Sequence, residues 1–305
     1  MKDVMRLDAA ETAFFKRQLE YIKSRTYDVK YRNLKAKMLI PVSTEVNAGA
    51  DFIIWYSWSR AGIAKIIADY AEDFPRVDVY AVENQSKVRS MGDSYGYNLK
   101  EIRRAQMAGV QLNTRKANAA KRAMEELQDK LAWYGDENFN IQGFFNYPGI
   151  TEFTIPVGAS TFKTWSTKTP DEIIQDLTGL MSAVSVPTKG REDVSQIIIA
   201  RTQYNDIKDR RMTDGNTNTI LNYFKNNNPG VSIEIVDELA GAGAGATDRI
   251  MAYVKDPNNL TMEIPQSFEQ LEANLKGMEY IIPCHAEYGG IIIYYPQSVA
   301  FGDGI

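Results

Sequence analysis

The sequence contains one cysteine and one histidine, and this scarcity excludes several kinds of chemistry. With Cys284 as its only cysteine, the chain cannot form an intramolecular disulfide or a zinc site of the cysteine-rich kind. The only histidine, His285, directly follows Cys284. Neighbouring residues of a strand point to opposite faces, so this pair does not predict a Cys–His dyad.

Long hydrophobic runs are also missing. No apolar stretch has the length of a membrane span, and the N-terminal MKDVMRLDAAET lacks the apolar core of a signal peptide. We therefore expect a protein without membrane segments that is made and kept in a cytoplasm-like compartment. The 305 residues, 44% of them hydrophobic, are enough for one large or two modest domains with a real core.

The net charge of −4 is unevenly distributed along the chain. Residues 16–37 contain eight basic and two acidic residues, a net of +6. Residues 231–305 contain three basic and eleven acidic residues, a net of −8. This polarity predicts either that the basic segment contacts nucleic acid or a neighbour's acidic face, or that both segments carry scattered solvated charge.

The strongest periodic pattern lies between Leu112 and Ile150. Asn113 or Thr114 can cap the start of a helix, and Gly135 can adopt the left-handed conformation that ends one. Between them, apolar or small residues recur with the spacing of one helical face. The expected apolar face consists of Ala117, Ala120, Met124, Leu127, Leu131 and Tyr134. The pattern predicts a long amphipathic helix that packs its two leucines on a sheet of the same subunit.

The rest of the chain alternates between helical and extended patterns, which predicts a mixed α+β fold. Further helices are expected over residues 11–26, 62–71, 98–107, 169–184, 202–210 and 217–226. Strands are expected over residues 51–58, 76–82, 86–97, 196–200, 231–236, 249–254, 279–283 and 290–295. The clearest helix start is Thr169, because Pro170 and two acidic residues follow it.

Residues 241–246, Gly-Ala-Gly-Ala-Gly-Ala, satisfy the dinucleotide-binding pattern G-x-G-x-x-A. Such a site requires a helix that begins directly after the glycines and directs free N–H groups at a phosphate. Here the residues from Thr247 onward have a strand pattern, and the usual acidic partner is poorly placed. A flexible loop is therefore the preferred interpretation, and a dinucleotide-binding enzyme is a remote alternative.

Paired carboxylates are present, but not in an arrangement that indicates catalysis. Glu125 and Glu126 lie on the solvated face of the long helix, and Glu192 and Asp193 lie in a loop. The sequence has no nucleophile elbow and no phosphate-loop lysine motif. We therefore predict no catalytic, cofactor-binding or metal-binding residue, no cofactor, and a protein that is not an enzyme.

The order of these features resembles the major capsid proteins of tailed phages, which share the Hong Kong 97 phage capsid fold. In that family a long helix often ends in an aromatic-Gly-Asp, as at Tyr134–Asp136, and a Gly followed by apolar residues and Asn comes next, as at Gly143–Asn146. The segment Gly289–Pro296 is similar to the family's last strand. Ala64–Val79 resembles a subgroup first catalogued as a domain of unknown function. The similarity covers nearly the whole chain, from about Glu11 onward.

The resemblance implies an α+β fold with a defined division of the chain. Residues 1–50 correspond to the N-terminal arm, 51–97 to the extended loop and its flanking strands, 98–150 to the peripheral domain with its spine helix, 151–190 to the connection between peripheral and axial domains, 191–250 to the axial domain, and 251–305 to peripheral strands and a C-terminal axial segment. The extended loop is usually a long β-hairpin in this family. The helical spacing of residues 62–71 departs from that pattern.

The resemblance also implies a function. The chain would be a structural protein of a bacteriophage virion that self-assembles, by way of a procapsid, into the hexamers and pentamers of an icosahedral shell around double-stranded DNA. Its expected partners are other copies of itself, separate scaffolding, portal and decoration proteins, and packaged DNA at the inner face. Assembly is expected in the host cytoplasm. Encapsulin nanocompartment shells share the fold and remain the alternative, distinguished by cargo enzymes in place of a genome.

Four aromatic residues gather in the segment that would form the extended loop. They are Phe52, Trp55, Tyr56 and Trp58. Aromatic side chains are enriched at contacts between proteins, and a monomer rarely exposes several together. We expect these residues to lie either at contacts between subunits or in the core of their own subunit, and the sequence favours neither.

Overall fold

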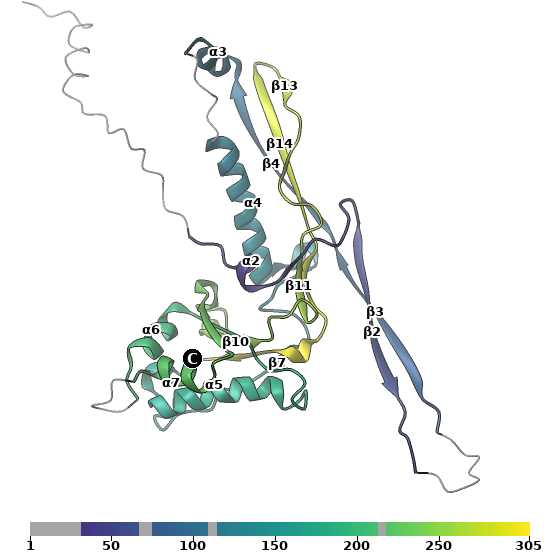
Figure 1. The fold of residues 1–305 in the computed structure, drawn as a ribbon. Helices are drawn as coiled ribbons and strands as arrows, with labels where there is room; N and C mark the ends of the chain where they lie inside the picture. Colours follow the sequence, from purple (N-terminus) through teal and green to yellow (C-terminus); the bar gives the residue numbers. More distant parts are fainter. Residues whose placement is uncertain (1–31, 67–74, 109–114, 213–217) are drawn as a thin grey trace, which may run out of the picture. The chain divides into compact units, whose positions relative to one another are not determined.

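The structure, a computed structural model, describes residues 32–66, 75–108, 115–212 and 218–305 (Figure 1). The chain divides into two units, Met1–Asn33 and Leu34–Ile305, and the description below concerns the second. The helix expected over residues 11–26 lies outside the described residues. So does most of the basic segment 16–37.

The long helix expected near the middle of the chain is confirmed as α4, Arg115–Tyr134. Gly135 follows it with a φ of 67°, in the left-handed region. The face that α4 buries differs from the expected one. Its buried residues are Ala120, Met124, Gln128, Asp129, Leu131, Ala132 and Trp133. Leu127 is 44% exposed, so the prediction that it packs on the sheet is wrong.

A polar contact explains why the buried face is displaced. The short helix α2, Ala36–Leu39, packs against α4, and the backbone N–H of Ala36 donates to Asp129 Oδ1 at 2.9 Å. A buried carboxylate is tolerated when it accepts such a hydrogen bond. Hydrophobic periodicity cannot anticipate this arrangement, because it assigns every acidic residue to the solvent.

Two leucines on α4 provide a matched test of this burial. Leu131→Ala should lower the free energy of unfolding by about 2–5 kcal/mol, because Leu131 is buried and its loss leaves a cavity. Leu127→Ala should change it by less than about 1 kcal/mol, because Leu127 is 44% exposed and its loss leaves no closed cavity. Urea unfolding of both variants measures the difference. Equal losses would contradict the observed orientation of α4.

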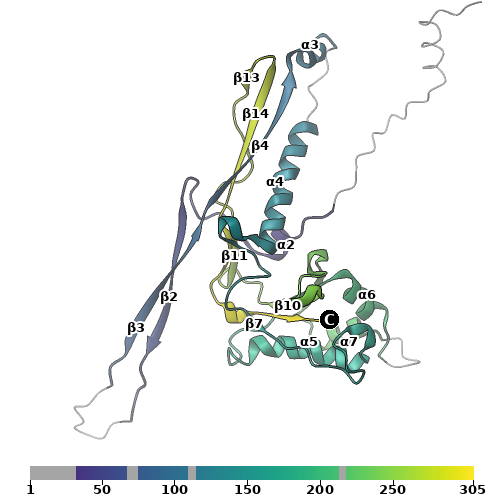
Figure 2. The same cartoon turned by 180° about the vertical axis from the view of Figure 1, so that it is seen from behind.

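The helix α4 lies along a long antiparallel pair of strands (Figures 1 and 2). These strands are β4, Arg89–Asn98, and β14, Glu279–Tyr288, which pair over ten residues. β12, Glu269–Gln270, and β13, Asn274–Lys276, also pair with β14. Helix α3, Leu99–Ala108, follows β4 as expected. The strand expected to end at Pro283 continues to Tyr288, because β4 supplies a partner along its full length.

A second sheet has the order β7-β16-β10-β8-β9. Its strands are β7 (Thr151–Glu152), β16 (Val299–Asp303), β10 (Arg249–Tyr253), β8 (Gln196–Ile199) and β9 (Ser232–Ile235). The helices whose buried residues share a core cluster with this sheet are α5 (Pro170–Ser185), α6 (Arg201–Asp209) and α7 (Ile220–Asn227). Thr169 and Glu172 form a reciprocal capping box at the start of α5, which confirms the expected helix start.

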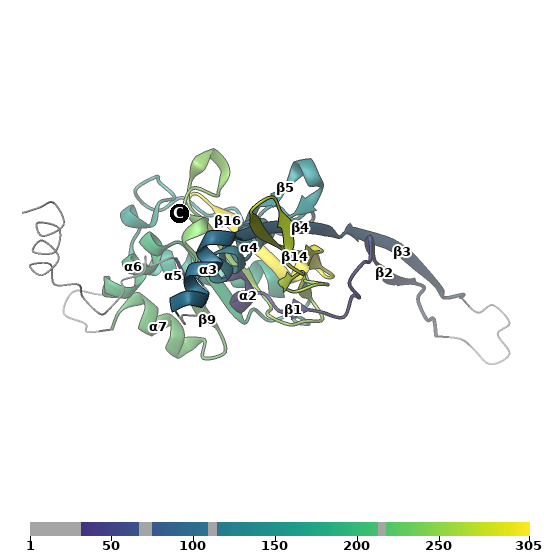
Figure 3. The ribbon, with the colours of Figure 1, turned by 90° about the horizontal axis from the view of Figure 1, so that it is seen from above.

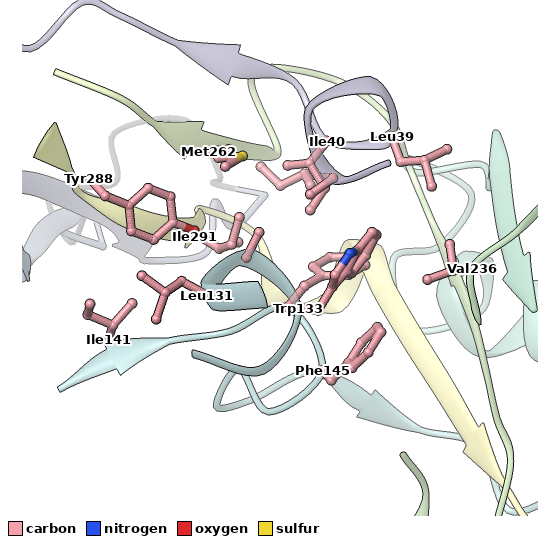
Figure 4. Close-up of a cluster of buried hydrophobic side chains, with 14 of the residues drawn as sticks. Leu39, Ile40, Leu131, Trp133, Ile141, Phe145, Val236, Met262, Tyr288 and Ile291 are labelled. Carbon is pink, nitrogen blue, oxygen red and sulfur yellow. The ribbon is translucent and has the colours of Figure 1, made fainter. Parts of the chain in front are cut away.

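A third, three-stranded sheet and a short hairpin complete the core. The sheet contains β1 (Val42–Ser43), β11 (Leu260–Glu263) and β15 (Gly290–Ile293), and the hairpin β5 (Gly135–Asp136) and β6 (Ile141–Gln142). The cluster drawn in Figure 4 joins α2 and α4 to these strands, with Ile40, Leu131, Trp133, Phe145 and Ile291 among its members. Burial of this apolar surface is the main force that holds α4 in place.

The strands β2, Phe52–Ala61, and β3, Asp78–Lys87, form an antiparallel ribbon of their own. In Figure 3 they run beside each other with no third strand alongside. The helix expected over residues 62–71 is wrong in its described part, since residues 62–66 are not helical. Ile63 and Ile66 are exposed there, so their helical spacing has no surface on which to bury an apolar face.

Candidate functional site

The residues considered for catalysis do not come together. Among the described residues, no group of three or more His, Cys, Asp and Glu side chains could hold a metal ion. Cys284 is buried and His285 half-buried on β14, where alternation directs them to opposite faces. Glu125 pairs with Lys121 one helical turn away, and Glu192 accepts a hydrogen bond from Asn259. Over the same part of the chain, no helix is long and apolar enough to cross a membrane.

The Gly-Ala loop uses its backbone donors within the chain. The N–H of Gly241 donates to Asp248 Oδ1 at 2.8 Å, and the N–H of Ala244 donates to Asp303 Oδ2 at 3.0 Å. Burial raises the pKa of Asp303, but hydrogen bonds from Arg249 and Ala244 outweigh it and leave that pKa below its ordinary value. The carboxylates of Asp248 and Asp303 thus accept hydrogen bonds from backbone N–H groups that a phosphate site would need to have free. The strand β10 follows the loop, as the sequence predicted.

The ribbon β2–β3 carries the largest group of exposed apolar side chains along regular strands. Directly opposite residues of an antiparallel pair share a face. The register pairs Ile54 with Gln85, Tyr56 with Glu83, and Trp58 with Ala81, so these residues lie on one face of the ribbon. The apolar stripe, as we call it, consists of Phe52, Ile54, Tyr56 and Trp58. Its members are 48–70% exposed.

The opposite face of the ribbon meets the rest of the unit only near its root. The ring of Trp55 packs edge-on against Tyr294, with ring centroids 6.0 Å apart. Ser86 Oγ donates to the carbonyl of Gly289 at 2.8 Å, and the N–H of Gly49 donates to Glu287 Oε2 at 3.1 Å. Farther along this face, Tyr80 and Val82 are exposed. The root is therefore anchored, whereas the remainder of the ribbon has little contact with its own chain.

The aromatic residues of this segment differ in their surroundings. Trp55 packs on its own subunit, whereas Phe52, Tyr56 and Trp58 are exposed. Sequence analysis did not single out Ile54, which continues the stripe. The alternation of β2 would have revealed it, since residues two positions apart in a strand share a face.

A cavity of about 800 Å³ lies beside the root of the ribbon. It is lined from the ribbon by Trp55, Tyr56 and Trp58, and from elsewhere mainly by residues near Val42, Pro257 and Tyr294. Its walls are mixed, because polar residues such as Ser43, Glu45 and Asn258 lie among the aromatic ones.

Comparison with known proteins identifies the family. The sequence model of the major capsid protein family matches residues 62–305, which is most of the chain. The chain belongs to this family. It is therefore a structural protein, a subunit of a phage capsid, and its place is in the capsid of the virion. This confirms the function expected from the sequence.

Solved structures show the same fold. The capsid of Myoviridae phage XM1 is 16% identical over 95% of this chain and 98% of that chain, with a TM-score of 0.78. The capsid of a native GTA particle is 10% identical over 97% and 99%, with a TM-score of 0.64. A virus-like particle from Pyrococcus furiosus is 15% identical over 87% and 91%, with a TM-score of 0.53. No curated protein matches the sequence. The similarities confirm the expected Hong Kong 97 phage-like fold.

Proposed function

We propose that this subunit forms the hexamers and pentamers of an icosahedral shell that encloses double-stranded DNA, and that the apolar stripe on β2 is a contact through which copies join. The observation that carries the proposal is the exposure of four large apolar side chains in a row on a ribbon that barely touches its own chain. A soluble monomer seldom leaves such a surface uncovered. Contact with a neighbouring copy would remove it from water.

In this proposal each segment of the chain has the role that was expected from the sequence. The ribbon β2–β3 acts as the extended loop, α4 as the spine helix of the peripheral domain, and the sheet around β10 with α5–α7 as the axial domain. The protein has no catalytic step and needs no cofactor. Scaffolding, portal and decoration proteins are separate chains, packaged DNA lies at the inner face without sequence-specific contacts, and assembly takes place in the host cytoplasm.

Assembly of the purified protein tests the role of the stripe. We expect the parent protein to form closed shells that are visible by negative-stain electron microscopy. Replacing Tyr56 and Trp58 together by Ser should prevent shell formation, because the contact loses its two largest exposed rings. The folded monomer should keep its stability within about 0.5 kcal/mol, since both side chains are exposed.

The opposite face of the ribbon provides a matched control. Tyr80 and Val82 are exposed to a similar extent, and their joint replacement by Ser removes comparable apolar surface from the other face. This variant should still assemble. If it fails while the stripe variant forms shells, the contact lies on the other face. If the parent remains a small, compact monomer under all conditions, the proposal of a self-assembling shell is wrong.

An encapsulin-like nanocompartment shell is the second candidate, favoured by the similarity to the virus-like particle from Pyrococcus furiosus. The two candidates differ in what the particle encloses. Particles isolated from their natural source should contain nuclease-protected DNA of uniform length if the shell packages a genome. A cargo protein in place of DNA would favour the nanocompartment.

A further inference from the structure

The cavity beside the root of the ribbon combines aromatic rings with acidic charge. Its aromatic lining residues are Trp55, Tyr56, Trp58, Tyr294 and Tyr295. Glu45 also lines it, whereas no lysine, arginine or histidine occurs among its described lining residues. The faces of aromatic rings attract cations, and a nearby carboxylate adds to that attraction. The composition of the cavity therefore favours a positively charged ligand.

A second carboxylate lies directly behind the wall of this cavity. Glu263 is 2% exposed, and its Oε1 accepts a hydrogen bond from the hydroxyl of Thr261 at 2.6 Å. Its Oε2 has no hydrogen-bond partner within the described residues. A buried carboxylate is costly unless its charge is compensated. Because Thr261 both lines the cavity and touches Glu263, a cation beside Thr261 would offset part of this buried negative charge.

The polar side chains of the wall present hydrogen-bond acceptors to the cavity. The hydroxyl hydrogen of Thr261 is donated to Glu263, and Tyr294 Oη lies 3.2 Å from Thr261 Oγ1. Tyr294 is therefore the donor in that contact, which leaves the lone pairs of its oxygen for a ligand. The side-chain N–H of Asn258 donates to a neighbouring carboxylate, and its amide oxygen can accept. Together with the carboxylate of Glu45, these oxygens supply the acceptors that a primary ammonium group, with its three N–H donors, requires.

The electrostatic surroundings of Tyr294 agree with this assignment. Burial raises the pKa of its hydroxyl, and the hydrogen bond with Thr261 opposes that shift. The negative charges of Glu263 and Glu45 raise this pKa further. Both carboxylates thus act on the same hydroxyl at the cavity wall. The negative potential that disfavours a phenolate there favours a bound cation, because the two effects depend on the sign of the same local potential.

We propose that this cavity binds a small aliphatic amine in its protonated form, such as a linear polyamine. The ammonium group lies near Glu45, Tyr294 and Asn258, and the hydrocarbon chain lies against the rings of Trp55 and Trp58. A quaternary ammonium ion has no N–H to donate, and a neutral alcohol has no charge, so each satisfies only part of the site. A single subunit supplies all of these residues, and the site therefore does not depend on shell assembly.

Titration of unassembled subunits with spermidine tests the proposal. Unassembled subunits are the suitable sample, because Tyr56 and Trp58 also belong to the apolar stripe. Calorimetry, together with the fluorescence of Trp55 and Trp58, should show saturable binding of one ligand per subunit. Tetramethylammonium and 1,4-butanediol should bind at least about tenfold more weakly, since they lack the N–H donors or the charge. If spermidine shows no saturable binding up to millimolar concentration, the proposal is wrong.

Two variants locate the bound ammonium group. Glu45→Gln should weaken spermidine binding at least about tenfold, because it removes a charge-assisted hydrogen bond. Tyr294→Phe keeps the ring that packs on Trp55 but removes the phenol oxygen, and it should weaken binding about threefold or more. Glu45 is exposed and Tyr294 half-buried, so both variants should fold. Unchanged binding in both would place the ligand elsewhere and would overturn the proposal.

Glu272→Gln is the matched control for general attraction to a negatively charged protein. Glu272 is exposed and does not line the cavity, so its replacement removes the same charge at another place. This variant should bind spermidine within about twofold of the parent, because an isolated surface charge contributes little. Equal losses for Glu45→Gln and Glu272→Gln would mean that spermidine follows only the net charge of the subunit, which would contradict a specific site.

Discussion

Replacing Lys168 by Met should lower the free energy of unfolding by about 3–5 kcal/mol, because it leaves a buried carboxylate without its partner. Lys168 Nζ donates to Asp176 Oδ2 at 2.5 Å, and the two side chains are 1% and 2% exposed. Trp165 Nε1 donates to the same oxygen at 2.9 Å. The ion pair joins α5 to the segment around Trp165, whose ring belongs to the core cluster of the sheet around β10, so its loss should affect that part of the subunit first.

The surroundings of this pair increase the expected effect. Arg210, which follows α6, donates to the carbonyls of Trp165 and Lys168 at 2.8 and 2.9 Å. The backbone that carries Lys168 is thus held at both ends, so this segment cannot easily move aside to let water reach the carboxylate of Asp176. Urea unfolding followed by tryptophan fluorescence would measure the loss, since Trp165 reports directly on this site.

A double substitution is the control. Lys168→Met combined with Asp176→Leu replaces both charges with apolar groups and should recover most of the stability, because the penalty comes from the unpaired charge and not from lost attraction. If the double variant is as unstable as Lys168→Met, the loss reflects packing. If Lys168→Met costs less than about 1 kcal/mol, the pair is not buried as described.

The pH dependence of the single variant has a definite sign. Burial raises the pKa of Asp176, although hydrogen bonds from Lys168 and Trp165 oppose the shift. A raised folded-state pKa favours folding below the ordinary range of the carboxyl, and this contribution is lost as the pH rises through the folded-state pKa. Removing Lys168 raises that pKa further. The deficit of Lys168→Met should therefore shrink as the pH falls toward the ordinary range of an aspartate.

Trp133→Ala should also cost about 3–5 kcal/mol, because it removes the largest fully buried side chain at the end of α4. Its ring stacks on Phe145 with centroids 5.2 Å apart and contacts Phe144 at 6.2 Å. Phe144 in turn meets Tyr253 of β10 edge-on at 5.2 Å. Thermal or urea unfolding should show the loss as a lower midpoint.

Trp133→Phe is the matched control. It keeps an aromatic ring in the same place and removes an indole N–H that has no hydrogen-bond partner within the described residues. We expect it to cost less than about 1.5 kcal/mol, as for other swaps that nearly conserve shape. If Trp133→Phe were as damaging as Trp133→Ala, the contribution would come from the indole itself and not from the stacked cluster.

Local features of the sequence were enough to place several elements. Thr169 and Pro170 mark the start of α5, and Gly135 marks the end of α4, because caps and left-handed glycines depend on only a few neighbouring residues. The strand that follows the Gly-Ala loop was also predicted, and it is present as β10. The order of such elements was sufficient to indicate the family.

Long-range pairing accounts for what the sequence did not reveal. The strand β14 continues past Pro283 because β4 pairs with it, and β16 was missed, since its five residues become a strand only between β7 and β10. The helical spacing of Ile63 and Ile66 was misleading, because no surface of the chain covers them. Amphipathic spacing predicts a helix only where such a surface exists.

Burial is likewise a property of the assembled fold and not of residue type. Asp129 is buried because the backbone of Ala36 reaches it, and Lys168 is buried where it pairs with Asp176 of α5, whereas Leu127 is exposed. The same holds for the apolar stripe. Composition showed that this segment is aromatic, but the register of β2 with β3 directs three of its aromatic side chains and Ile54 to a single open face, because alternation along a strand assigns every second residue to the same side.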